Sequence, residues 1–262
     1  MPLPTFDKID IDFLISIARE AGAAILEIYE SDFTVETKSD TSPLTKADSQ
    51  SHKIIVTHLL KRYPKIPIIS EESSNVSAYE ERSKWKMFWL IDPLDGTKEF
   101  IKRNGQFTVN IALILDSRPH VGIVYAPALD LLYWGQTGQG AFKKEASGQV
   151  IKLEMFKPKP NDKLVITGSL SHSTPAMETF LDEQRAQHKS VEFVAMGSSL
   201  KLCMVADGSA NIYPRFGPTM EWDTAAAHAI VNASGHKVLR YGSSEELYYN
   251  KRDLHNSWFL VY

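Results

Sequence analysis

The sequence contains a single cysteine, Cys203, among 262 residues. One thiol excludes an internal disulfide framework and a zinc site built from cysteines, and it fits the reducing cytoplasm, where we expect the protein to be. The chain also lacks any apolar run of roughly 18 residues, the length that would indicate a transmembrane segment. Its first residues lack the basic and apolar regions of a secretory signal peptide. We therefore expect no part of the chain to span a membrane.

An excess of positive charge is also missing, because 29 Lys and Arg residues face 32 Asp and Glu residues. The formal net charge of −3 gives no basic surface for a nucleic acid polymer. A hydrophobic fraction of 43% and a charged fraction of 23% are typical of globular proteins. These bounds favour a small-molecule partner and leave the oligomeric state open.

The first half of the chain predicts helices that cover a largely antiparallel sheet. Apolar residues in 7–30 recur at spacings of three and four, as on one buried face of a helix. A second helix is expected to begin near Thr45, with Thr45 and Asp48 resembling a capping box. Short β-rich segments then follow with turn residues between them, which predicts hairpins: IPIIS, MFWLI, TVNIALIL, VGIVYAP and LLYWGQ.

The second half reads differently, because strand and helix patterns alternate in it. Pro158 and Pro160 interrupt regular structure and mark the best boundary, so we expect two halves, 1–156 and 157–262. The alternation predicts an α/β second half with its own sheet. Cys203 follows the apolar face of a predicted helix and is expected in the core. The glycines of GQTGQG lack the lysine of a P-loop and predict a hairpin turn.

Two aspartates crowd the end of a predicted strand in WLIDPLDGTKEF, residues 89–100. Asp92 and Asp95 flank Pro93, and a turn there could direct both carboxylates and the Leu94 carbonyl to one point. Like charges so close raise each other's pKa unless a cation joins them. Oxygen ligands at this density suit Mg²⁺, although an acidic surface turn explains the same residues.

Three further acids have a functional and a structural interpretation each. Glu71 in ISEES ends another predicted strand, but taken alone, beside Glu72, it is better explained as an exposed acid than as a ligand. Asp223 in EWDTAAAHAI starts an alanine-rich helix, where an aspartate usually serves as an N-cap or first-turn acid. Asp48 is explained by the capping box alone. Taken singly, none of the three requires chemistry.

Together and in this order, the segments EES, DPLDGT and WDTAA resemble the inositol monophosphatase superfamily of Mg²⁺-dependent, lithium-sensitive phosphatases. Further segments are similar to the bacterial 3′(2′),5′-bisphosphate nucleotidases of the CysQ type: SPLTKAD, WLIDPLDGTKEFIKRNGQFTVNIALI, GIVYAPALDLLYWG, GSSLK and YPRFGPT. The resemblance covers nearly the whole chain. It implies an α+β / α/β fold, a layered α-β-α-β-α sandwich of the sugar phosphatase type, with the site between two halves.

The resemblance also implies a role for each acidic residue. Metal ligands would be Glu71, Asp92, the Leu94 carbonyl, Asp95 and Asp223, holding about two or three Mg²⁺ ions. Asp48 and Thr97, bonded to each other, would position the attacking water, and Glu71 would contribute to catalysis. No covalent enzyme intermediate is needed in such a reaction.

Substrate-binding residues are likewise implied by the resemblance. Ser198, Lys201 and Arg215 match positions that bind the 5′-phosphate and ribose of a nucleotide, and Ser171 and His172 would lie near the nucleoside. The remaining contacts would come from Asp95, Gly96, Thr97 and Asp223. Lys98 and Glu99 stand where inositol phosphatases typically carry Thr-Asn, which argues against an inositol substrate. Ala227 replaces a common glycine by another small residue, so close helix packing is expected to be kept.

The expected activity is hydrolysis of adenosine 3′(2′),5′-bisphosphate to AMP and phosphate, a step that clears a by-product of sulfate activation. Two alternatives stay open: phosphatase activity on inositol or fructose phosphates, and a catalytically silent nucleotide sensor. Every residue that is implied to bind a metal ion or to position the attacking water is present, which argues against a catalytically silent sensor. The resemblance allows peripheral association with the cytoplasmic face of an inner membrane, but no basic amphipathic anchor supports it.

Overall fold

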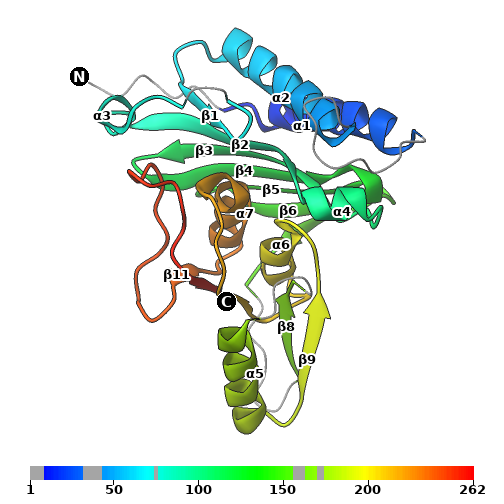
Figure 1. Cartoon of the computed structure of the whole chain (residues 1–262), viewed down its shortest axis with the longest axis vertical. Coiled ribbons are helices and arrows are strands. Elements are labelled where there is room, and N and C mark those ends of the chain that lie inside the picture. Colours follow the sequence, from blue (N-terminus) through cyan, green and yellow to red (C-terminus); the bar gives the residue numbers. More distant parts are fainter. Residues whose placement is uncertain (1–8, 32–42, 74–75, 156–162, 170–173) are drawn as a thin grey trace.

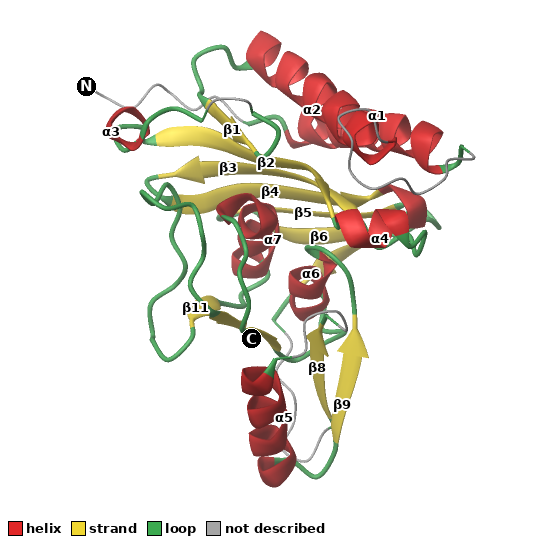
Figure 2. Ribbon diagram, in the orientation of Figure 1, coloured by secondary structure: helices red, strands yellow, loops and turns green. Residues whose placement is uncertain are grey.

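The computed structural model describes residues 9–31, 43–73, 76–155, 163–169 and 174–262. Its elements form layers: a helical pair, a seven-stranded sheet, a second helical pair, two small sheets and an outer helix (Figure 1). The helices and strands of each layer stand out when the chain is coloured by secondary structure (Figure 2). The expected layered α-β-α-β-α sandwich is confirmed. No helix of the described residues is long and apolar enough to cross a membrane.

The outer helical layer consists of α1 (Ile11–Tyr29) and α2 (Pro43–Arg62), which pack against each other. Asp10 caps α1, because its side chain accepts the backbone N–H of Phe13 at 3.0 Å. The buried face of α1 has the periodicity expected from the sequence. Helix α2 begins at Pro43, so Thr45 lies inside its first turn rather than at the N-cap. The capping-box interpretation of Thr45 and Asp48 is therefore wrong.

The central sheet has the strand order β1-β2-β3-β4-β5-β6-β7. Its strands are β1 (Ile68–Ser70), β2 (Met87–Asp95), β3 (Thr108–Leu115), β4 (Arg118–Ala126), β5 (Leu131–Gln136), β6 (Gly140–Lys144) and β7 (Val150–Leu153). Among the strands described for this sheet, only β1 and β2 pair in parallel, and the other neighbours are antiparallel, as the hairpin-rich sequence predicted. Short helices α3 (Tyr79–Arg82), α4 (Thr97–Ile101) and η1 (Pro127–Leu129) join some of these strands.

Helix α7 (Glu221–Ala233) crosses the other face of this sheet and contacts β2, β3, β4 and β5. Gly122 on β4 permits the approach, because a Cβ there would lie 1.9 Å from the carbonyl oxygen of Ala226. Ala227 is fully buried in the same helix, which agrees with the close packing expected for it. The N-terminus of α7, where Asp223 lies, is thus held at a fixed place relative to the sheet.

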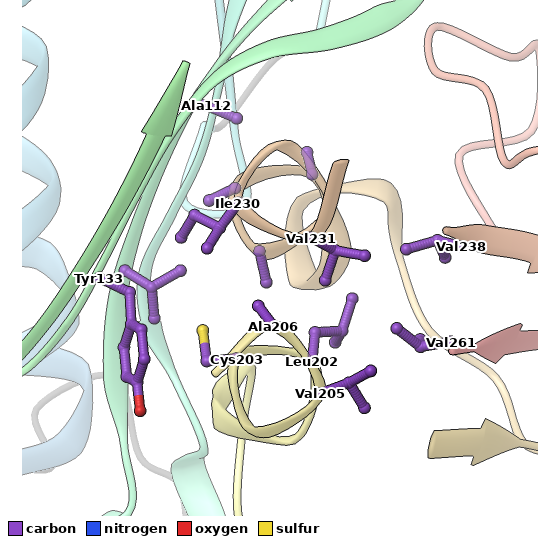
Figure 3. Close-up of a cluster of buried hydrophobic side chains, with 14 of the residues drawn as sticks. Ala112, Tyr133, Leu202, Cys203, Val205, Ala206, Ile230, Val231, Val238 and Val261 are labelled. Atoms are coloured by element: carbon purple, nitrogen blue, oxygen red, sulfur yellow. The ribbon is translucent and has the colours of Figure 1, made fainter. Parts of the chain in front are cut away.

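Helix α6 (Leu200–Ala206) packs beside α7 and completes one hydrophobic core between the large and small sheets. Figure 3 shows Cys203, Leu202 and Ala206 of α6 pointing into this core together with Ile230 and Val231 of α7. Cys203 has no exposed surface, so its expected place in the core is confirmed. The GQTGQG turn joins β5 and β6 as a hairpin, which was also predicted.

The second half builds two small sheets where one was expected. Strands β8 (Leu164–Gly168) and β9 (Val191–Ala195) pair in parallel across α5 (Pro175–Gln187). Strands β10 (Tyr213–Arg215), β11 (Val238–Arg240) and β12 (Phe259–Val261) form an antiparallel sheet in the order β10-β12-β11. An isolated parallel bridge pairs Ile166 of β8 with Ile212, the residue before β10, and links the two sheets. The boundary segment around Pro158 lies outside the described residues, and the division at 156/157 stays a prediction.

Candidate active site

The parallel pair β1 and β2 brings two acidic segments to one edge of the sheet. Ser70 pairs with Ile91, so Glu71 and Asp92 follow directly at the same end of neighbouring strands. The backbone N–H of Glu71 donates to the Ile91 carbonyl at 3.2 Å. Asp92 is buried, whereas the Glu71 side chain is exposed. Carboxyl ends of strands are frequent places for sites in α/β proteins.

A bulge places Asp95 differently from Asp92. Asp92 pairs with Asn110 and Asp95 with Thr108, so three steps along β2 match two along β3. Pro93 lies in this irregularity, where a residue without a backbone N–H is tolerated. The Asp92 side chain accepts the Leu94 N–H at 3.1 Å and stabilises the turn. Leu94 itself is buried.

Helix α2 is fixed to this turn by side chains on its inner face. Ser51 donates to the Pro93 carbonyl at 2.7 Å, and His52 Nδ1 is 2.9 Å from the Ser70 hydroxyl. Asp48, on the preceding turn of α2, is therefore held close to the strand ends. Thr97 is the first residue of α4, and α4 contacts α2. The bond expected between Asp48 and Thr97 stays a prediction.

Asp223 occupies the first turn of α7 and contributes to the cap of that helix. Its Oδ2 accepts the backbone N–H of Met220 at 2.9 Å. The other oxygen stays available to a ligand, and Asp223 lines a cavity of about 120 Å³. The structural and functional interpretations of Asp223 are therefore compatible with each other.

The electrostatic environment joins these acids into one group. Burial raises the pKa of the Asp92 carboxyl well above its ordinary value. Four other carboxylates add to that rise of the Asp92 pKa, in decreasing order Asp95, Glu71, Asp223 and Asp48. Burial and the charge of Asp95 raise the pKa of Asp223 to about 7. Burial also raises the pKa of Asp95, although Lys201 and hydrogen bonds from Ser199 oppose the rise.

These five acids fit a cation in charge and in chemistry. Their oxygens are the ligands that Mg²⁺ prefers, and their mutual repulsion needs a positive charge to compensate it. Within the described ranges, no three acidic, histidine or cysteine side chains are already drawn together as a closed metal site. The donor set is thus suitable in chemistry, although its side chains are not gathered as ligands around one point.

The cavity beside the acids is lined by two cations from the second half of the chain. Lys201 is 7% exposed, and its Nζ donates to the Ser198 carbonyl at 2.6 Å. Burial lowers the pKa of Lys201 to about 8, although Asp95 opposes the shift. Arg215 donates from Nη2 to the Pro218 carbonyl at 2.8 Å, while its buried Nε has no hydrogen-bond partner among the described residues. Such a pair suits a phosphate group.

The structure brings fewer than half of the thirteen sequence-predicted site residues to the wall of this cavity. Its lining includes six of them: Asp95, Gly96, Ser198, Lys201, Arg215 and Asp223. Gly96 precedes α4 with a φ of +95°, a conformation that favours glycine. Ser171 and His172 lie outside the described residues. Their expected contacts with a nucleoside stay predictions, as do the functions of the other residues.

Sequence reasoning missed Ser199, a buried residue at the N-terminal end of α6. Its backbone N–H and its hydroxyl both donate to Asp95 Oδ2, at 2.7 and 3.0 Å. The only signal was its position beside Ser198 in the GSSLK segment. Its distance in sequence from Asp95 gave no reason to pair the two. Ser51 and its bond to Pro93 were missed for the same reason.

Curated proteins with a described activity are similar to the chain in sequence over most of their length. A 3′(2′),5′-bisphosphate nucleotidase CysQ from Salmonella typhimurium is 44% identical over 230 residues, covering 87% of this chain and 89% of that protein. The Escherichia coli K12 protein of the same description is 43% identical over the same coverage.

Solved structures show the same similarity. The crystal structure of CysQ from Bacteroides thetaiotaomicron, described as a bacterial member of the inositol monophosphatase family, has a TM-score of 0.88. It is 42% identical, with 95% of each chain covered. Inositol monophosphatase II from Staphylococcus aureus, 23% identical with a TM-score of 0.75 over 96% and 90% of the two chains, shares the fold. A model described as the inositol monophosphatase family matches residues 9–258, and the chain belongs to that family.

Proposed function

We propose that the protein is a Mg²⁺-dependent phosphatase that hydrolyses adenosine 3′(2′),5′-bisphosphate to AMP and phosphate. The observation that carries this proposal is the cavity in which Asp95 and Asp223 face Lys201 and Arg215. The acidic side chains can hold metal ions on one side of a substrate. The side chains of Lys201 and Arg215 can bind a second phosphate group on the other side. The nucleotidases at 43–44% identity support the same substrate.

Metal binding is assigned to the acids at the sheet edge. The ligands of two or three ions would be Glu71, Asp92, Asp95, Asp223 and the Leu94 carbonyl. When bound, Mg²⁺ would lower the pKa of a coordinated water molecule and neutralise negative charge on the phosphoryl group. The chain's own contribution is the fixed backbone around these ligands. Parallel pairing positions Glu71 and Asp92, and the bulge positions Asp95.

Positioning of the attacking water is assigned to Asp48 and Thr97. Both residues lie on elements that contact each other, and the hydrogen bond from Ser51 to Pro93 ties α2 to the metal-binding turn. A carboxylate held in one orientation can accept the proton of the water, and geometry matters as much as acidity for that step. Glu71, at the exposed side of the group, can contribute to the same proton transfer.

Substrate choice is assigned to the second half of the chain. Lys201 and Arg215 would bind the unreactive 5′-phosphate, with Ser198 beside them on the cavity wall. Ser171 and His172 would contact the nucleoside. The two halves, 1–156 and 157–262, would then divide the work between metal binding and nucleotide binding, with Asp223 as the ligand supplied by the second half.

Inositol and fructose phosphates are the nearest alternative substrates, since relatives with this fold include inositol monophosphatases. Lys98 and Glu99 both line the cavity and give its wall charged groups, which suit an uncharged sugar ring less well than a charged nucleotide. The two cations favour a substrate with two separated phosphates. We also propose a cytoplasmic location and inhibition by lithium, in keeping with the family resemblance.

The proposal is tested by phosphate release from a panel of substrates at saturating Mg²⁺. The panel contains adenosine 3′,5′-bisphosphate, adenosine 2′,5′-bisphosphate, inositol 1-phosphate and fructose 1,6-bisphosphate. We expect the two nucleotides to give the highest kcat/KM, activity to disappear with EDTA, and LiCl to inhibit. Preference for inositol 1-phosphate would assign the alternative activity, and binding of the nucleotides without turnover would assign the sensor.

A further inference from the structure

Ser199 joins the two halves of the candidate site through hydrogen bonds to three elements. Its backbone N–H and hydroxyl donate to Asp95 Oδ2 at the end of β2. Its hydroxyl also lies 2.7 Å from the Asp223 carbonyl in α7. Asn110 on β3 donates from Nδ2 to the same hydroxyl oxygen at 2.8 Å. Ser199 is 1% exposed, so water does not replace these partners.

The donors and acceptors of Ser199 determine which hydrogen bond each of its groups makes. The serine hydroxyl has one proton, which it shares between Asp95 Oδ2 and the Asp223 carbonyl. Its oxygen lone pair is used by Asn110. The backbone N–H of Ser199 is committed to Asp95 alone. Asp95 Oδ2 therefore receives two hydrogen bonds from one residue, while Oδ1 remains for another ligand.

We propose that Ser199 is a positioning residue for Asp95 and, through the Asp223 carbonyl, for the start of α7. This inference rests on the proposed function, because Asp95 and Asp223 are taken as metal ligands. By holding Oδ2, Ser199 sets the rotation of the Asp95 carboxylate and would leave Oδ1 for a metal ion. The same hydroxyl keeps the first turn of α7 against the end of β2. Ser199 thereby fixes the relative position of ligands that come from different halves of the chain.

Outer hydrogen bonds of this type commonly change metal affinity by about 10-fold to 100-fold when they are removed. Ser199→Ala deletes the hydroxyl but keeps the backbone N–H on Asp95, so the lower end of that range is expected. Ser199→Thr keeps both donors and should restore affinity. The change acts on the geometry of the site, so its main effect should be on metal binding rather than on the reaction at saturating metal.

A matched control is available in Ser234, another buried serine. Its hydroxyl donates to the Val231 carbonyl at 2.8 Å, near the far end of α7. Eleven residues separate it from Asp223, or about 16 Å along the helix. Ser234→Ala removes the same group from a buried hydrogen bond of similar length. It controls for loss of stability without touching the site.

The experiment measures Mg²⁺ affinity by isothermal titration calorimetry on the full chain, together with the melting temperature in EDTA. We expect the Kd of Ser199→Ala to rise about 10-fold, while Ser199→Thr and Ser234→Ala bind like the parent. In turnover assays, the Mg²⁺ concentration for half-maximal rate should rise for Ser199→Ala, with kcat at saturating Mg²⁺ close to the parent's.

The opposite results would overturn the inference. An unchanged Kd in Ser199→Ala would show that the hydroxyl does not position Asp95. Equal weakening in Ser234→Ala would assign the effect to stability alone. If the parent chain binds no Mg²⁺, both the metal site of the proposed function and this inference are overturned. If the parent binds Mg²⁺ and Ser199→Ala binds it equally well, only the inference about Ser199 fails.

Discussion

Glu71 and Asp92 lie at the same edge of the sheet because strands β1 and β2 run in parallel. The backbone N–H of Glu71 donates a hydrogen bond to the Ile91 carbonyl at 3.2 Å. These two strands are the only parallel pair among the strands described for the large sheet. An antiparallel pair would have placed the two strand ends at opposite edges. The acidic site thus depends on one local exception to the hairpin topology.

The first prediction concerns Asp92, which we expect to be essential for the metal. Asp92→Asn removes a negative charge without changing volume, so it should abolish phosphate release and the rise in melting temperature caused by Mg²⁺. In EDTA the variant should melt at or above the temperature of the parent, because burial and four neighbouring carboxylates raise the Asp92 pKa. Asp116→Asn, an exposed aspartate with a φ of 46°, is the matched control. Activity close to the parent's at ordinary Mg²⁺ would contradict the assignment.

The second prediction concerns the pH dependence of metal-free stability. The folded-state pKa of Asp223 is raised from 3.8 to about 7. The folded state therefore holds a proton that the unfolded state has released in this range. The resulting stability is complete below pH 3.8 and is lost as the pH rises through about 7. Mg²⁺ should remove this loss by replacing the proton.

The measurement is the melting temperature between pH 5 and 8 with EDTA or with Mg²⁺. We expect the difference between the two conditions to be smallest at pH 5 and largest at pH 8, because proton and metal compete for the same oxygens. Asp92→Asn should flatten the difference. A Mg²⁺ effect that is constant over this range would mean that Asp223 and its neighbours do not carry it.

Much of the site could be predicted from the sequence because its acids lie in short local patterns. The strand that ends at Asp92, the turn around Pro93 and the helix that starts near Asp223 are all consequences of local residue preferences. The sequence also left the cap and ligand interpretations of Asp223 as alternatives. The structure uses Oδ2 for the cap, which leaves the other oxygen for the cavity.

The remaining features could not be predicted, because they depend on contacts between distant residues. Ser199 meets Asp95 across 104 positions, and Ser51 meets Pro93 across 42. The split of the second half into two small sheets depends on the register of three-residue strands, which carry little signal. The start of α2 was placed two residues late, since Pro43 is acceptable in the first turn of a helix.

The third prediction concerns Asp48, whose functional interpretation no longer competes with a capping box. Asp48→Asn should leave the melting temperature nearly unchanged, because the residue lies within α2 rather than at its cap. If Asp48 accepts a proton from the attacking water, kcat should fall by roughly 10²-fold or more. Unchanged turnover would reject this function, and a large fall in melting temperature would indicate a structural one.

The fourth prediction concerns the packing of α7 on the sheet. Gly122→Ala places a Cβ 1.9 Å from the Ala226 carbonyl oxygen, which the backbone of α7 can relieve only by moving away. We expect a loss of about 3 kcal/mol or more in unfolding free energy, at the upper end for overpacking, together with weaker Mg²⁺ binding. Gly138→Ala meets no atom within 4 Å but has a φ of +79°. It should cost about 1–2 kcal/mol and leave Mg²⁺ binding intact.

The last prediction concerns Arg215 and substrate selectivity. A 5′-phosphate that does not react can contribute binding energy that positions the phosphate that does. Arg215→Ala should therefore lower kcat/KM for adenosine 3′,5′-bisphosphate, with a loss of transition-state stabilisation of about 2–4 kcal/mol. Hydrolysis of adenosine 3′-monophosphate, which lacks the second phosphate, should be almost unchanged. Arg240→Ala, which removes a guanidinium paired with Glu245 on the surface, should affect neither substrate.

Steady-state kinetics on the two nucleotides separate the possible functions of Arg215. A selective loss on the bisphosphate supports a phosphate contact, because only that substrate carries the group. An equal loss on both would mean that Arg215 supports the metal site or the fold, through its bond to the Pro218 carbonyl or its charge beside Asp223. Lys201→Met then decides whether the 5′-phosphate site lies in this cavity. Lys201 lines the same wall, and its loss should reproduce the selective effect if the phosphate binds there.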